Sequence, residues 1–433
     1  MNLRKVVIMK NFYKLWLGEL ISSIGSGMTA FALSVYVYKK TGSVSYVSLI
    51  TLLSFMPSII LSPIGGLLAD RYDRRLLMIM GDLFSGLGLI YILWNIQAGA
   101  KSIVPIFVGI TFSSIFTSLL EPSYRATLTD ILEAENYAKA SGLIQAAGSA
   151  KYLISPVIAG MILSVVDIRV ILLLDILTFI TTCLMIFLVR KSMNSETQNY
   201  KKDSFKGLLE GLFIIKENRG VYSLVIIMFF VCFFMGFIQI LIRPMILALS
   251  NVKTAGMMES LCALGLLIGS LWIGIAGIKK NYSKILAVAC FFCGIFMSMT
   301  GVNENLNIIG ISTFLFFSTL PFMNSCADVL VRVSIPNELQ GRVWGLISLI
   351  TQMGTVVAYI ISGIMADYVF EPMFNKNGIL VENIGIIIGT GKGRGIGFML
   401  ILSGIGMLIM AIVIWKNGEI REVSEKCVDL KFK

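Results

Sequence analysis

The chain has 433 residues, of which 56% are hydrophobic and 14% are charged, and its mean hydropathy is +0.85. A soluble domain typically contains about 45–50% apolar and about 25% charged residues. Too few charged side chains are present here to cover a soluble surface. The composition therefore excludes a soluble enzyme, a secreted scaffold and a disordered chain, and it predicts a polytopic membrane protein.

Apolar stretches long enough to cross a bilayer recur along the chain, since a hydrocarbon core about 30 Å thick needs ~20 residues of helix. The runs are continuous rather than alternating, which favours helices over strands. The first follows a basic segment but is too long for a signal peptide, so we interpret it as a retained span. The predicted fold class is an all-α membrane protein with twelve transmembrane helices, at residues 14–38, 45–68, 76–97, 102–121, 139–165, 169–189, 221–247, 254–277, 284–300, 306–326, 343–368 and 393–415.

The net charge of +11 fits either a nucleic-acid partner or a membrane protein with positive loops on its cytoplasmic side. With the N-terminus inside, most of the 36 lysines and arginines fall in cytoplasmic segments, which predicts that both termini are cytoplasmic. These charges are spread over short loops rather than gathered on one basic surface with interleaved aromatic residues. We therefore expect no nucleic-acid partner.

Cysteine usage predicts no special chemistry. The chain has seven cysteines and no histidine. Cys290 and Cys293 form a CxxC motif, but it lies in an apolar span without a second pair, so helix packing is favoured over metal or redox chemistry. No metal site, disulfide framework or cofactor is predicted.

The longest charged stretch, residues 190–220, divides the predicted spans into six and six. It separates an N-terminal bundle (1–189) from a C-terminal bundle (221–415), which is followed by a cytoplasmic tail (416–433). Within the linker, apolar residues at helical spacing over positions 205–213 predict an amphipathic helix on the inner membrane face.

The two halves also resemble each other weakly. When segment 122–163 is aligned with segment 325–366, Glu135 matches Glu338, and Gly142 and Gly160 match Gly345 and Gly363. The matches fall in the loop and helix that follow spans four and ten. Such symmetry is typical of duplicated six-helix bundles that rock around a central site.

The loop between spans two and three carries the most specific motif. It reads Gly66-Leu67-Leu68-Ala69-Asp70-Arg71-Tyr72-Asp73-Arg74-Arg75. This resembles the signature loop of the major facilitator superfamily, G-x-L-a-D-R-x-G-R-R/K, with Asp73 in place of the usual glycine. The resemblance implies a fold of two pseudo-symmetric six-helix bundles.

The resemblance also implies a conformational switch, formed by Gly66, Asp70, Arg71, Arg74, Arg75 and Glu121. It places Asp70 against the N-terminus of span eleven, where a carboxylate meets a helix dipole. It pairs Arg74 with Glu121 at the inner end of span four. The alternative is that the arginines are only positive-inside anchors, but anchoring does not require the interleaved acids.

A narrower resemblance covers segments 15–28, 121–126, 138–143, 174–179 and 391–397. Together they resemble the drug:proton antiporter branch, which includes bacterial macrolide-efflux proteins, siderophore exporters and a lysophospholipid transporter. The resemblance implies export of something amphiphilic. Segment 391–397 is not a P-loop, because Gly393 follows Lys392 where a Ser or Thr is required. Transport is therefore expected to use an ion or substrate gradient.

Ionisable residues inside spans are costly, and by default they are functional candidates. Glu19 lies five residues into span one, roughly 8 Å from its inner end at 1.5 Å per residue. It is a candidate for proton coupling, and a hydrogen bond between helices is the equally weighted alternative. Asp175 in span six, with Arg169 one and a half turns away, is a second candidate, but a structural role is favoured. Lys151 in span five requires a carboxylate partner that the sequence does not identify.

The second half contains further charged residues in its spans. Glu259 in span eight is a third candidate for proton coupling, although an ion pair with Arg243 of span seven is favoured. Asp328 and Arg332 are four residues apart and share one helix face. They predict an inner gate or a structural pair. Asp367, at the outer end of span eleven, has no predicted role.

The sequence thus predicts a transporter, not an enzyme, in a bacterial cytoplasmic membrane. It is expected to export drug-like or macrolide-like amphiphiles by proton antiport, with alternating access, and so to confer antibiotic resistance. Its expected partners are the substrate, protons and membrane lipid, and a monomer is expected. The alternatives are a lipid, lysophospholipid or siderophore facilitator and, less favoured, a non-transporting membrane sensor.

Overall fold

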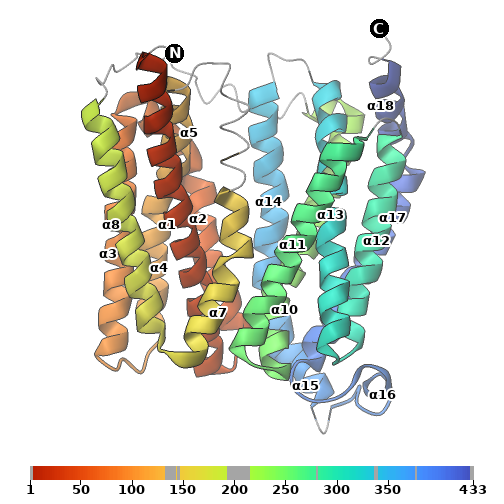
Figure 1. Ribbon diagram of the computed structural model, residues 1–433. Coiled ribbons are helices and arrows are strands. Elements are labelled where there is room, and N and C mark those ends of the chain that lie inside the picture. The colour runs from red at the N-terminus through yellow and green to blue at the C-terminus, as the bar shows by residue number, and fades with distance from the viewer. Residues whose placement is uncertain are drawn as a thin grey trace. The chain divides into compact units, whose positions relative to one another are not determined.

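The computed structural model describes residues 3–131, 143, 147–192, 215–278, 281–335, 340–375 and 378–429. Every secondary-structure element within these ranges is a helix (Figure 1). In chain order they are α1 (Leu3–Thr41), α2 (Val44–Arg71), α3 (Arg74–Gln97), α4 (Val104–Thr117), α5 (Leu120–Ile131), α7 (Ser155–Val165), α8 (Ile168–Ser192), α10 (Arg219–Leu249), α11 (Val252–Ala276), α12 (Tyr282–Val302), α13 (Leu306–Ser334), α14 (Gln340–Met365), the π-helix η3 (Ala366–Phe370), α15 (Glu371–Phe374), α16 (Gly385–Ile388), α17 (Arg394–Lys416) and α18 (Gly418–Asp429).

The predicted number of spans is confirmed. Among the described residues, 12 helical stretches are long and apolar enough to cross a membrane. Their ends mostly lie within a few residues of the predicted ones. The first stretch, Met9–Thr41, begins five residues earlier than predicted because the helix continues through its basic start.

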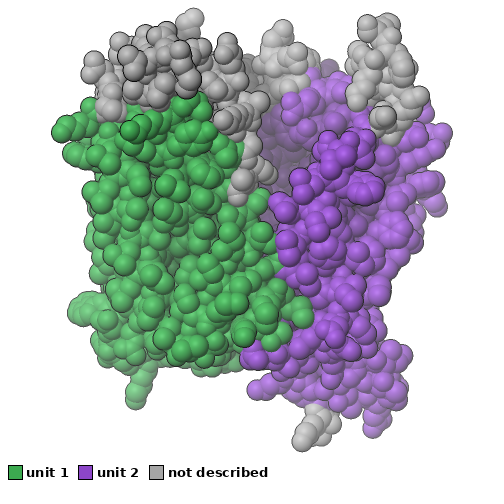
Figure 2. Space-filling model, viewed as in Figure 1, with its two compact units in different colours: residues 1–42, 49–201, 252–260 green, residues 43–48, 202–251, 261–433 purple. Residues whose placement is uncertain are grey.

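The chain forms two compact units (Figure 2). Unit 1 comprises residues 1–42, 49–201 and 252–260, and unit 2 comprises residues 43–48, 202–251 and 261–433. The first turn of α2 thus belongs to unit 2, and the first turns of α11 belong to unit 1. The amphipathic linker helix predicted over positions 205–213 lies outside the described residues.

Unit 1 is organised around α1 and α3. Helix α1 packs against α8, α7 and α5, whereas α3 packs against α4, α8 and α5. The close approach of α1 to α8 depends on Gly25. A Cβ atom at this position would lie 2.5 Å from Thr178 Oγ1 and 2.6 Å from Asp175 Oδ1. Small residues allow helix backbones to approach in this way, so the glycine brings the polar groups of α8 against α1.

Unit 2 is built around α10 and α12. Helix α12 packs against α13 and α17, and α10 packs against α14 and α17. Cys290 and Cys293 are fully buried in α12, with Cys293 Sγ 2.8 Å from Thr319 Oγ1, as expected for packing residues. The predicted tail contains α18, which packs against α10 and α13, and Ser223 Oγ donates to Glu419 of α18.

Two carboxylates in the segment after α14 cap helices of unit 2. Asp367 in η3 accepts hydrogen bonds at 2.8 Å from the backbone N–H groups of Val44 and Ser45 in the first turn of α2. Ser43 Oγ also donates to this carboxylate. Glu371 accepts from the N–H of Ile396 at 3.1 Å, at the start of α17. Both acids complement the unpaired N–H groups and partial positive charge of a helix N-terminus.

Candidate functional site

Glu19 lies on α1 and remains partly exposed. Its Oε1 accepts a hydrogen bond of 3.3 Å from Ser23 Oγ, one turn further along the same helix. An ionised carboxylate away from water is costly unless it is paired or well hydrogen-bonded. The hydrogen bond from Ser23 is long and compensates only part of this cost, and the proton-coupling role of Glu19 stays a prediction.

Asp175 lies on α8 and is 1% exposed. Its Oδ1 accepts hydrogen bonds from Thr178 Oγ1 at 3.2 Å and from Ser26 Oγ of α1 at 3.5 Å. With Gly25 packed against it, Asp175 forms part of the α1–α8 contact. The structural role that the sequence favoured for Asp175, and the alternative of proton coupling, both stay predictions.

Lys151 and Arg169 differ in their relation to these acids. Lys151 is half-buried, and its expected carboxylate partner stays a prediction. Arg169 instead pairs with Asp167, with Arg169 Nε 3.0 Å from Asp167 Oδ1. The backbone N–H and the guanidinium of Arg169 both lower the pKa of Asp167.

Asp82 on α3 is an acid that the sequence interpretation passed over. It is 1% exposed, and its Oδ2 has no hydrogen-bond partner among the described residues. Its helix packs against α8, the helix of Asp175, which packs in turn against α1, the helix of Glu19. The sequence could have identified Asp82, because it is an ionisable residue inside the predicted span 76–97, as Glu19 is inside span one. Unit 1 therefore brings together three carboxylates from α1, α3 and α8.

The signature loop joins α2 to α3. Asp73, at the position where the superfamily usually has glycine, caps α3 by accepting from the backbone N–H of Arg75 at 3.0 Å. Its other oxygen, Oδ2, accepts from Arg190 Nε of α8 at 2.9 Å. Replacement of the glycine thus gives this loop a helix cap and an ion pair, neither of which was predicted.

The remaining loop residues take different positions. Gly66 lies on α2 with nothing within 4 Å of an added Cβ, Arg71 is exposed, and Arg75 is buried. Arg74 Nε donates to the backbone oxygen of Ala69 at 3.0 Å. Glu121 lies exposed in the first turn of α5, and its pairing with Arg74 stays a prediction. The side chain of Asp70, and with it the predicted contact at span eleven, lies outside the described part of the chain.

The candidates of the second half lie on α10, α11 and α13. Glu259 lies on α11 within the part of that helix that belongs to unit 1, and its pairing with Arg243 stays a prediction. Asp328 and Arg332 form an ion pair on α13, with Arg332 Nη2 3.3 Å from Asp328 Oδ2. The side chains of both are about half exposed, so the pair is placed to stabilise the helix modestly.

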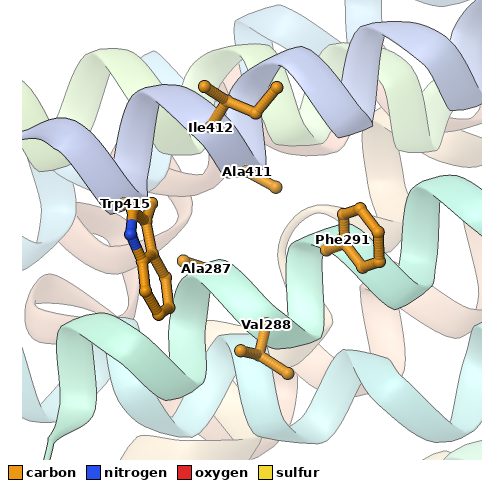
Figure 3. Close-up of a pocket in the computed structure, with 6 residues that line it drawn as sticks. All are labelled: Ala287, Val288, Phe291, Ala411, Ile412 and Trp415. Carbon is orange, nitrogen blue, oxygen red and sulfur yellow. The ribbon is translucent and has the colours of Figure 1, made fainter.

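A shallow groove lies between α12 and α17 of unit 2 (Figure 3). Its lining is apolar and consists of Ala287, Val288, Phe291, Ala411, Ile412 and Trp415. Four of these side chains are largely exposed, as expected for helix faces that contact lipid. No predicted site residue lines this groove, and it offers no carboxylate for proton exchange.

Comparisons with known proteins place these observations in context. Residues 15–369 match the family described as the Major Facilitator Superfamily. The chain is 25% identical to macrolide efflux protein A of Streptococcus pyogenes, covering 87% of this chain and 94% of the relative. It is 26% identical to an enterobactin exporter of Shigella flexneri over 153 residues, which cover 35% and 37% of the two chains.

The fold is also similar to solved structures. A bacterial homologue of the iron transporter ferroportin aligns with a TM-score of 0.69 at 13% identity, covering 94% of this chain and 98% of that one. At this identity the similarity shows the fold alone. It confirms the all-α fold that the continuous apolar runs predicted and that the signature loop implied as a major facilitator fold.

Proposed function

The chain belongs to the major facilitator superfamily, and on this premise we propose that it exports amphiphilic small molecules, macrolides among them, in exchange for protons. The similarity to macrolide efflux proteins over 87% of the chain carries the proposed substrate class and direction. Transport would proceed by alternating access, with the two halves rocking around a central site. The proposed location is the bacterial cytoplasmic membrane, and the proposed state is a monomer.

Proton coupling requires a group whose protonation favours one conformation over the other, because a ligand shifts an equilibrium only by its differential affinity. Glu19 supports this role best: it combines partial exposure with a position inside a span and one weak hydrogen bond. Asp175 is fully buried in a helix contact, which favours a supporting role. Glu259 remains a third candidate.

The conformational change itself is assigned to the signature loop. Asp70, Arg74 and Glu121 would form contacts present in one state and absent in the other. The pair of Asp328 and Arg332 would serve as an inner gate or simply stabilise α13. These roles extend the resemblance of the loop to that of the superfamily.

The first test measures accumulation of radiolabelled erythromycin in cells that express the protein, with and without a protonophore. Lower accumulation that the protonophore abolishes would support energised export. The Glu19→Gln variant should then accumulate erythromycin like cells without the protein. Unchanged accumulation across a broad panel of amphiphiles would contradict drug export, and labelled lysophospholipid and enterobactin would be the next substrates.

A further inference from the structure

We propose that Asp82 of α3 is a second proton-binding residue of the transport cycle. Its helix packs against α8, the helix of Asp175, which packs in turn against α1, the helix of Glu19. This inference rests on the proposed proton antiport, and it adds a site to it that lies deeper in unit 1.

The carboxyl group of Asp82 is buried without compensation. Its residue is 1% exposed, and Oδ2 has no hydrogen-bond partner among the described residues. An ionised carboxylate in such surroundings is strongly disfavoured, whereas a protonated carboxyl is neutral and far less costly. A proton is therefore the simplest group that can compensate this site.

The next buried polar residue on α3, Ser85, lies one turn further along the helix and has hydrogen-bond partners. Ser85 Oγ lies 2.6 Å from Ser113 Oγ and 3.2 Å from Thr117 Oγ1, so its hydroxyl is satisfied within the contact with α4. The buried hydroxyl of Ser85 therefore has partners within a helix contact, whereas Oδ2 of Asp82 has none among the described residues.

The ionisable residues of the helices that pack against α3 carry both signs of charge. Helix α8 has Arg169, Asp175, Cys183, Arg190 and Lys191, and α5 has Glu121, Tyr124, Arg125 and Asp130. Helix α4 has no ionisable residue in its sequence.

On α3 itself, the basic residues lie in the first turn, and Arg75 is two turns before Asp82. The burial of Asp82 and the missing partner of its Oδ2 among the described residues are therefore the reason to expect a protonated carboxyl.

Negative charges on Glu19, Asp82 and Asp175 would repel one another, and such repulsion couples the proton equilibria of the three acids. When the partly exposed Glu19 loses its proton, its new charge disfavours ionisation of Asp82. When Glu19 is protonated, release of the proton from Asp82 becomes easier. The interior carboxyl can therefore respond to the state of the partly exposed one without a direct contact.

The decisive test is infrared spectroscopy of the purified protein in lipid nanodiscs, because it needs no substrate. The wild type should show the carbonyl stretching band of a protonated carboxylic acid near neutral pH. Asp82→Asn should lose that contribution in the difference spectrum, and Ser85→Ala should retain it. An unchanged band in Asp82→Asn would overturn the proposal.

The transport arm uses proteoliposomes and radiolabelled erythromycin. Asp82→Asn should lose accumulation driven by a pH gradient but keep counterflow, the exchange of labelled for unlabelled erythromycin without a gradient. Asp82→Glu, which keeps the carboxyl, should restore part of the gradient-driven transport. If Asp82→Asn does not fold, Asp82→Val replaces it, with an apolar side chain that needs no hydrogen bond.

The outcomes separate this inference from the proposed function. Gradient-driven transport that persists in a folded Asp82→Asn would overturn the coupling role of Asp82. Loss of counterflow together with gradient-driven transport would also overturn it, since a structural defect affects both. A wild type that shows no gradient-driven transport would overturn the antiport proposal, while the infrared band would still decide whether Asp82 holds a proton.

Discussion

Arg190 donates a hydrogen bond to Asp73 at 2.9 Å, and this ion pair joins the end of α8 to the start of α3. The same aspartate caps α3 through its other oxygen. One side chain therefore fixes both the direction of α3 and its contact with α8. It does so at a position where the superfamily usually has a residue without a side chain.

We expect Asp73→Ala to lower the stability of the protein more than Asp73→Gly does. Loss of an N-cap to alanine costs about 1 kcal/mol, whereas glycine at this position costs only a few tenths of a kcal/mol. Arg190→Ala should cost about 0.2–1 kcal/mol, because the pair is partly exposed. Thermal unfolding of the detergent-solubilised variants measures the order, and equal stability of Asp73→Ala and wild type would contradict it.

The same substitution should have opposite effects at two glycines of unit 1. In Gly25→Ala the added Cβ would lie 2.5 Å from Thr178 Oγ1, so α1 and α8 must separate, at a cost of about 1–3 kcal/mol. In Gly66→Ala nothing lies within 4 Å of the new atom. Alanine is the better helix former by roughly 0.5–1 kcal/mol, so this control should be as stable as wild type or more so.

Removal of the cap at the start of α2 should loosen that turn. Asp367→Ala eliminates the acceptor of the Val44 and Ser45 N–H groups, which are bound at 2.8 Å. Hydrogen exchange measured by mass spectrometry should then accelerate in peptides that cover residues 43–48. Glu371→Ala serves as the matched control, because its loss should accelerate exchange at the start of α17 instead. Unchanged exchange at residues 43–48 would contradict the capping role of Asp367.

Glu19 and Asp175 should differ in the property that their loss affects. Glu19→Gln should abolish protonophore-sensitive export while leaving stability close to that of wild type, since it disturbs one weak hydrogen bond of 3.3 Å. Asp175→Ala should mainly lower stability, because it removes the acceptor for Ser26 and Thr178 at the α1–α8 contact. Export assays and thermal unfolding on both variants test this, and a reversed pattern would refute the assignment.

The sequence by itself determined the architecture. Long continuous apolar runs leave only helices as a way to satisfy the backbone in a bilayer, so composition and length alone predict twelve spans. The loop from Gly66 to Arg75 identified the superfamily, because its residues and its place between two spans are specific together. Glu19 and Asp175 could be selected because an acid in an apolar run is visible without any coordinates.

Tertiary structure decided which of these acids have partners. Asp175 and Ser26 are 149 positions apart in the chain, and their contact exists because Gly25 lets α1 approach α8. Asp82 appears in the sequence as readily as Glu19, but only packing reveals that it is buried and that its Oδ2 lacks a partner among the described residues. Likewise, Asp73 finds Arg190 only when α3 and α8 lie side by side. The physical reason is that hydrophobic length fixes a helix locally, whereas the energy of a buried charge depends on neighbours from distant parts of the chain.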